Sequence, residues 1–248
     1  MLGFLGPPRS LEQLVLDPPW SLRRQSYEPR LQRHGVVNAD GFGVGWYAPE
    51  VRPEPVCYRS DRPIWSDGSF TSLAGTVSSP AVVASVRSAT APAPSDVSGA
   101  HPFTAGSWLF AHNGVVFGFR DGVGTRLRRM VSDRREPGIV GAADSEVLFA
   151  LVLDTVDAGA SPADALADVV ARVTAESGGR LNLLLTDGRQ MVATRWGEDL
   201  HVLARDSPDG CERVVASEPS DDETGWQPVP DRSLVTVTAD DLAVVSLP

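Results

Sequence analysis

The chain has 248 residues, and its 42% hydrophobic content is enough to bury a core, which excludes a disordered protein. Its 32 acidic and 22 basic residues give a formal net charge of −10, which argues against general nucleic-acid binding because it repels a phosphate backbone. No apolar run reaches the roughly 20 residues that cross a bilayer, and no signal peptide is recognisable, so we expect a cytoplasmic protein without a membrane partner.

All 22 basic residues are arginine, and the chain contains no lysine. This excludes Schiff-base and pyridoxal-phosphate enzymes, Ser-Lys dyads and P-loop ATPases, since each of them needs a lysine. Cys57 and Cys211 lie far apart without CxxC spacing, and the four histidines show no ligand spacing. We therefore expect neither a metal nor an organic cofactor.

The first predicted elements are a short helix and three strands. Ser10 can cap a helix over residues 11–17, which two prolines then end. Alternating or continuous apolar residues predict strands over 55–59, 81–87 and 108–112.

Two segments are predicted to be loops. The stretch 90–98 is rich in alanine, proline and serine. The arginine-rich segment 120–135 is interrupted by acidic residues, so we interpret it as a solvated loop, with an anion site as the alternative.

Helices and strands are segregated in the second half of the chain. Apolar spacing predicts a helix behind Asp144, and a second helix begins with the cap Ser161 and ends at Gly178. Strands are then predicted over 181–186, 190–196, 200–205, 213–217, 234–238 and 243–247. This order favours an α+β sandwich of antiparallel sheets covered by a pair of helices, within one domain.

Two segments in the first half of the chain have a structural and a functional interpretation. Residues 38–47 carry three alternate glycines, which allow a strand to twist or another backbone to approach, but no helix follows that would make a phosphate cradle. Arg87 ends an apolar strand, where it can bind a carboxylate as a fork or form an internal pair with an aspartate.

Two later segments are equally ambiguous. Asn113-Gly114 is typical of a hairpin turn, yet the same amide and the following glycine N–H can act as two donors to an oxyanion. Asp144 is a good helix N-cap, and it can instead present a carboxylate to a substrate ammonium.

Taken together, these segments resemble the class II glutamine amidotransferases, which are N-terminal-nucleophile hydrolases, over roughly residues 1–220. Within that family, the chain is similar to the hydrolases of γ-glutamyl-hercynylcysteine S-oxide, a group that serves ergothioneine biosynthesis. The segments that carry this similarity are residues 2–8, 16–19, 21–26, 38–47 and 216–219.

The resemblance implies a four-layer αββα sandwich, a single glutamine amidotransferase type-2 domain over residues 1–248, and hydrolysis of the γ-glutamyl amide of a small molecule. It also implies the roles of the site residues. These are Arg87 for the α-carboxylate, Asp144 for the α-ammonium, Asn113 and the Gly114 N–H for the oxyanion, and Thr90 and His101 as further pocket-lining residues.

The chain departs from the family at its beginning. The family begins Met-Cys-Arg, and the thiol of the exposed cysteine attacks while its own α-amine acts as base. This chain begins Met1-Leu2-Gly3, and an internal cysteine lacks the free amine. Either the true start lies upstream, in a sequence Met-Cys-Arg-Met-Leu-Gly, or the nucleophile has been lost. We favour the first explanation, because the other site residues persist.

The 248-residue form itself is expected to be inactive. The alternatives are a γ-glutamyl-binding protein without catalysis and a glutaminase subunit that supplies ammonia to a separate synthase. Neither the leaving group nor the oligomeric state follows from the residues.

Overall fold

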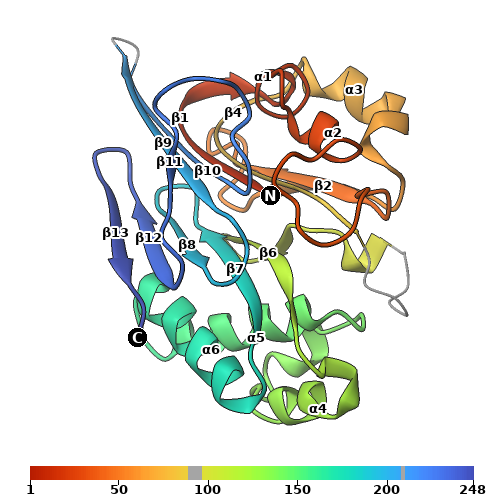
Figure 1. Ribbon diagram of the computed structural model, residues 1–248, viewed down its shortest axis with the longest axis vertical. Helices are drawn as coiled ribbons and strands as arrows, with labels where there is room; N and C mark the ends of the chain where they lie inside the picture. The colour runs from red at the N-terminus through yellow and green to blue at the C-terminus, as the bar shows by residue number, and fades with distance from the viewer. Residues whose placement is uncertain (89–96, 208–209) are drawn as a thin grey trace.

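A computed structural model describes residues 1–88, 97–207 and 210–248, which form two antiparallel sheets with helices on their outer faces (Figure 1). The first sheet has the strand order β11 (Gln227–Pro228), β9 (His201–Ser207), β10 (Gly210–Ala216), β1 (Leu2–Ser10), β4 (Ser78–Val86), β2 (Phe42–Trp46) and β3 (Val56–Ser60). The second has the order β13 (Leu242–Ser246), β12 (Ser233–Val237), β8 (Met191–Arg195), β7 (Gly179–Thr186), β6 (Trp108–Val116) and β5 (Phe103–Ala105).

The helices fall into two groups, one for each sheet (Figure 1). The first group is α1 (Leu11–Val15), α2 (Leu22–Gln25) and α3 (Gly68–Ala74), and the second is α4 (Val123–Arg128), α5 (Asp144–Asp157) and α6 (Pro162–Glu176). Short 3-10 turns are η1 (Ile64–Ser66), η2 (Val97–Gly99), η3 (Phe119–Asp121) and η4 (Glu136–Gly138). Within the described ranges, no helix combines the length and the apolar character that a membrane span requires.

Side chains alternate across the sheets and so define the layers. Leu2 and Phe4 of β1 face outward, into a cluster with Leu11 of α1 and Phe70 of α3, whereas Leu5 faces the other sheet. This is the period of two that a strand buried on both faces requires.

Strand β6 shows the same alternation from the other side. Leu109 and Ala111 face the space between the sheets, and Phe110 packs against α5 and α6 together with Leu183 and Leu185 of β7. Helix, sheet, sheet and helix therefore follow one another, which confirms the predicted four-layer αββα sandwich.

Local signals placed several elements correctly. The Ser10 hydroxyl accepts from the Gln13 N–H in a full capping box, and Ser161 caps α6 by accepting from the Asp164 N–H. The alternate glycines of 38–47 allow the expected close approach of another backbone, because a Cβ on Gly43 would overlap the carbonyl of His101.

The prediction of a hairpin turn at Asn113-Gly114 is wrong. Strand β6 continues through both residues and pairs with β7 as far as Val116, which lies opposite Gly179. The glycine is needed here for a close approach, since a Cβ on Gly114 would overlap the carbonyl of Arg180.

The prediction that Asp144 is a helix N-cap is off by one residue. Ala143 is the N-cap and Asp144 is the first helical residue. Its carboxylate accepts instead from the backbone N–H of Val116, with Oδ2 2.8 Å from the nitrogen. A tertiary contact to β6 thus replaces the local cap.

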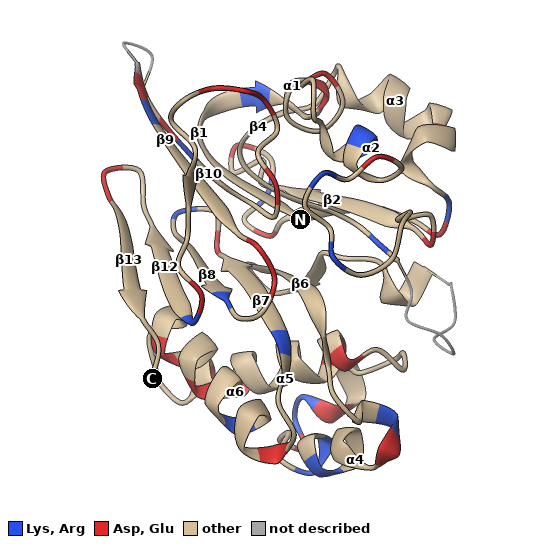
Figure 2. Cartoon of the chain, viewed as in Figure 1, with Lys and Arg blue, Asp and Glu red and all other residues tan. Residues whose placement is uncertain are grey.

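The segment 120–135 is not simply a loop, because it contains α4. Val123 and Leu127 are buried against α5, which a helical spacing of four residues allows. Its arginines lie beside acidic residues of the same layer (Figure 2), and Arg126 Nε is 2.6 Å from Glu176 Oε2. Of the loop predicted over 90–98, residues 97 and 98 begin η2, and the rest lies outside the described residues.

Candidate active site

A cavity of about 730 Å³ opens at the N-terminal end of β1, between the two sheets. The described site residues predicted from the sequence all line it: Arg87, His101, Asn113, Gly114 and Asp144. Thr90, predicted as a further pocket residue, lies outside the described residues. Met1 lines the same cavity, because β1 lies centrally between β4 and β10.

Arg87 follows β4 and is held from both sides. Its backbone N–H donates to Gly41 O at 2.8 Å, and its carbonyl accepts from the Asp40 N–H at 3.0 Å. The guanidinium lies against Gly99, where a Cβ would be 2.6 Å from Cζ. Gly99 therefore makes room for the cation at the cavity wall.

Asp144 enters the cavity from the first turn of α5. Oδ2 accepts from the Val116 N–H and Oδ1 accepts from the Ser145 N–H, both at 2.8 Å. These two bonds fix the direction of the carboxylate.

His112 was not predicted from the sequence, yet it connects these elements. Its side chain is buried, with Nε2 3.0 Å from Arg180 O and Nδ1 3.0 Å from Ser145 Oγ. Because a carbonyl only accepts, Nε2 carries the hydrogen. The Ser145 hydroxyl lies between His112 Nδ1 and Asp144 Oδ1, to which it donates at 3.2 Å. His112 thereby links β7 to the start of α5.

Asn113 and Gly114 lie on β6 beside Met1. The Asn113 amide donates to Ser217 Oγ at 2.9 Å. Along a strand, backbone amides two residues apart face the same side, so the Gly114 N–H faces the same side as the Val116 N–H, away from β7 and toward Asp144. Two donors are thus available on the cavity side of β6.

His101 is buried against the edge of Phe103, with ring centroids 4.9 Å apart. Burial lowers its pKa to about 3, and the proximity of His112, Arg87 and the N-terminus lowers it further. The imidazole is therefore neutral near pH 7. Within the described part of the chain, its Nε2 has no hydrogen-bond partner.

The N-terminus contributes an amine rather than a thiol. Burial lowers the pKa of the Met1 α-amine to about 6, partly offset by Glu218, and Met1 O accepts from the Ser217 N–H at 2.9 Å. Neither Cys57 nor Cys211 lines the cavity. Burial also raises the pKa of Cys57 to about 11, which keeps that thiol protonated.

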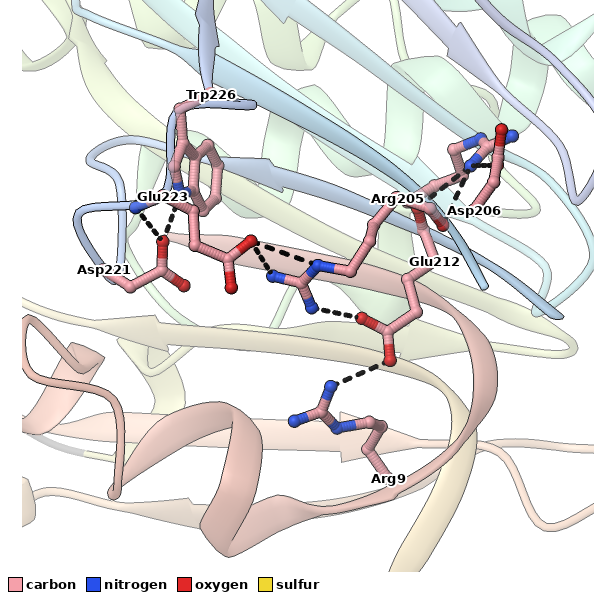
Figure 3. Close-up of polar contacts among 8 residues, drawn as sticks. Arg9, Arg205, Asp206, Glu212, Asp221, Glu223 and Trp226 are labelled. Atoms are coloured by element: carbon pink, nitrogen blue, oxygen red, sulfur yellow. Dashed lines mark hydrogen bonds and ion pairs between the residues drawn. The ribbon is translucent and has the colours of Figure 1, made fainter. Parts of the chain in front are cut away.

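A second, smaller hollow of about 390 Å³ lies on the outer face of the first sheet. Its two arginines are paired with acidic residues, as Figure 3 shows. Glu212 binds Arg9 at 2.8 Å and Arg205 at 2.6 Å, and Arg205 also binds Glu223 at 2.6 Å. These ion pairs favour a structural role, so the first cavity is the candidate site.

Comparisons with known proteins identify the family of the chain. The family model described as glutamine amidotransferases class-II matches residues 20–221. The chain is 42% identical over 247 residues to the γ-glutamyl-hercynylcysteine sulfoxide hydrolase of Mycobacterium tuberculosis, covering 99% of this chain and 95% of that protein. It is 43% identical to the hydrolase of the same name from Mycolicibacterium smegmatis, covering 95% of this chain and 94% of that one.

Solved structures support the fold. A class-II domain protein from Silicibacter pomeroyi superposes with a TM-score of 0.71 at 28% identity, over 100% of this chain and 98% of that one. The phosphoribosylpyrophosphate amidotransferase of Bacillus subtilis gives the same TM-score at 14% identity, over 100% of this chain and 49% of that one, and it shows the fold alone.

Proposed function

The chain belongs to the class II glutamine amidotransferase family, and we propose that it hydrolyses the γ-glutamyl amide bond of γ-glutamyl-hercynylcysteine sulfoxide, a step of ergothioneine biosynthesis. One observation carries the proposal: Arg87, Asn113, Gly114 and Asp144 line a single cavity at the start of β1. The names and the near-complete coverage of the two mycobacterial relatives support the choice of substrate. Each of the two sheets combines strands from distant parts of the chain, which supports one domain over residues 1–248.

The glutamyl head is a zwitterion, and the cavity offers a complementary charge for each end. The Arg87 guanidinium binds the α-carboxylate as a fork, and the Asp144 carboxylate binds the α-ammonium. A head that is held at both ends places its γ-carbonyl at a fixed position, which is what an intramolecular-like attack requires.

The γ-carbonyl oxygen then meets the two donors of β6. When the tetrahedral intermediate forms, the Asn113 amide and the Gly114 N–H stabilise the negative charge that develops on this oxygen. The Asn113 amide leaves its contact with Ser217 to do so.

The nucleophile is the thiol of a cysteine two residues before Met1. Two extended residues span about 7 Å, so such an extension of β1 enters the cavity. The thiol attacks the γ-carbonyl carbon, its proton passes through the α-amine to the leaving amine, and water cleaves the resulting thioester to release glutamate. The α-amine of that cysteine is the base that accepts the thiol proton.

The test compares the 248-residue chain with the same chain preceded by Met-Cys-Arg. We expect the extended form to release glutamate from γ-glutamyl-hercynylcysteine sulfoxide, and both the 248-residue form and the extended form with Cys→Ala to stay at background. Turnover by the 248-residue form refutes the thiol mechanism. Ammonia release from glutamine at a higher kcat/KM than glutamate release from the conjugate refutes the substrate and favours a glutaminase.

A further inference from the structure

Strands β6 and β7 place four side chains on the face that lines the cavity. Ala111 and Leu184 face the space between the sheets, so the residues that alternate with them do the same: Asn113 and Val115 of β6, and Asn182 and Arg180 of β7. In the register, Asn113 lies opposite Asn182 and Val115 lies opposite Arg180. Arg180 is therefore the diagonal neighbour of the proposed oxyanion donor Asn113.

The side chain of Arg180 is anchored at one end only. Its Nε forms an ion pair with Glu198 Oε1 at 2.5 Å. Its Cγ packs closely against Gly197, since a Cβ on that glycine would lie 3.2 Å from Arg180 Cγ. Among the described residues, neither η nitrogen of Arg180 donates a hydrogen bond, and the guanidinium carbon lies 5.9 Å from the centroid of the Phe117 ring. Since Arg180 lines the cavity and its side chain is 25% exposed, these nitrogens are available to a ligand.

The backbone at Glu198 is held by Asn182 of the same strand, β7. The Asn182 amide donates to the carbonyls of Glu198 and Asp199, each at 3.1 Å, and its oxygen accepts from the Trp196 N–H at 2.8 Å. Asp199 is tied in turn to Arg195 at 2.8 Å. The guanidinium of Arg180 is thus preorganised rather than free to move with solvent.

The position of Arg180 relates it to the leaving group. Diagonal neighbours in an antiparallel pair lie about 7–8 Å apart, a span that an arginine side chain bridges. When the γ-carbonyl lies at Asn113 and Gly114, the leaving nitrogen and the carbon after it lie within that reach. Glutamine, which leaves as ammonia, offers nothing to the η nitrogens.

We propose that Arg180 selects γ-glutamyl substrates whose leaving amine carries its own α-carboxylate, by binding that carboxylate through its two η nitrogens. The substrate class is that of γ-glutamyl amino acids and their side-chain conjugates, to which a cysteine conjugate belongs. This inference rests on the proposed function, because it assumes that the γ-glutamyl head occupies Arg87 and Asp144.

Another cavity-lining arginine, Arg120, is the competing candidate. It also has no hydrogen-bond or ion-pair partner among the described residues, but it is exposed on η3 and no acidic side chain anchors it. An unanchored arginine pays more side-chain entropy when it binds, which favours Arg180.

Calorimetry on the 248-residue chain tests the proposal with two probes that differ in one charge, γ-glutamylglycine and γ-glutamylglycinamide. We expect γ-glutamylglycine to bind about tenfold more tightly. In Arg180→Gln this ratio falls to about one, while the Kd of γ-glutamylglycinamide stays within about twofold. The ratio is measured within each variant, so it does not depend on variant stability. Arg189→Gln, in the turn at the far end of β7, keeps the ratio.

The outcomes separate the two claims. Equal binding of both probes to the wild-type chain, a ratio retained in Arg180→Gln, or the same loss in Arg120→Gln overturns the role of Arg180 and leaves the γ-glutamyl site intact. If neither probe binds the wild-type chain, the proposed function fails and the role of Arg180 fails with it.

Discussion

The Asp144 carboxylate accepts a hydrogen bond from the Val116 N–H at 2.8 Å, so the first turn of α5 is tied directly to β6, the strand that carries both proposed oxyanion donors. The proposed ammonium-binding carboxylate and the proposed oxyanion donors are thus connected by a direct hydrogen bond. A substrate held by Asp144 is aligned with Asn113 and Gly114 by the fold itself.

Replacing Asp144 by Asn removes the charge and keeps an oxygen for the Val116 N–H. We expect glutamate to bind at least tenfold more weakly, because a charge-assisted contact to its ammonium is lost. Calorimetry measures the affinity, and Asp133→Asn, on an exposed residue outside the cavity, is the matched control. Unchanged affinity in Asp144→Asn removes this carboxylate from the site.

Gly99→Ala tests the room that the Arg87 guanidinium needs. The new Cβ would lie 2.6 Å from Cζ, so the guanidinium must shift while the backbone stays in place. We expect the Kd of glutamate to rise about fivefold or more with little change in Tm. Gly68→Ala, where a Cβ has no heavy atom within 4 Å, is the control. Equal affinities for both variants contradict the assignment of Arg87.

Gly114→Ala is expected to destabilise the fold itself. Its Cβ would overlap the backbone carbonyl of Arg180, which cannot turn away without disrupting the pairing of β6 with β7. The expected loss is about 1–3 kcal/mol in the free energy of unfolding, measured by denaturant titration. If Gly114→Ala lowers the free energy of unfolding as little as Gly68→Ala does, β6 and β7 are less closely packed than the structure indicates.

The protein is expected to become less stable as the pH falls, because His101 is buried in its neutral form. Its folded pKa of about 3 lies below the unfolded value of about 6.5, so between these values the unfolded chain binds a proton that the folded chain does not. The neutral ring therefore favours folding at pH 7, and this contribution is lost as the pH falls. From pH 7 to 5, wild type should lose about 2 kcal/mol more than His101→Gln. If the free energies of unfolding of the two proteins change equally with pH, His101 is not buried in its neutral form.

Local signals predicted the elements whose ends and faces are set by neighbours in sequence. Ser10 and Ser161 are caps because their hydroxyls meet the N–H three residues later. Strand β1 was not predicted, because its glycines and prolines hide the alternation of its apolar residues, and its burial depends on β4 and β10, which lie far along the chain.

Long-range pairing explains the parts of the site that sequence reasoning missed. Asn113-Gly114 is a strong turn signal, but pairing with β7 overrides it and keeps both residues in a strand. His112 and the backbone it binds at Arg180 are 68 residues apart, and no local pattern joins them. Arg87, Asn113 and Asp144 could be assigned in advance only through the family resemblance.

The most direct measurement is a crystal structure of the 248-residue chain with glutamate bound. We expect the α-carboxylate on the Arg87 guanidinium, the α-ammonium on the Asp144 carboxylate, and the γ-carboxylate next to Asn113 and Gly114, with contacts of about 2.7–3.1 Å. Glutamate bound elsewhere, or bound in this cavity with its α-groups away from Arg87 and Asp144, would contradict this expectation.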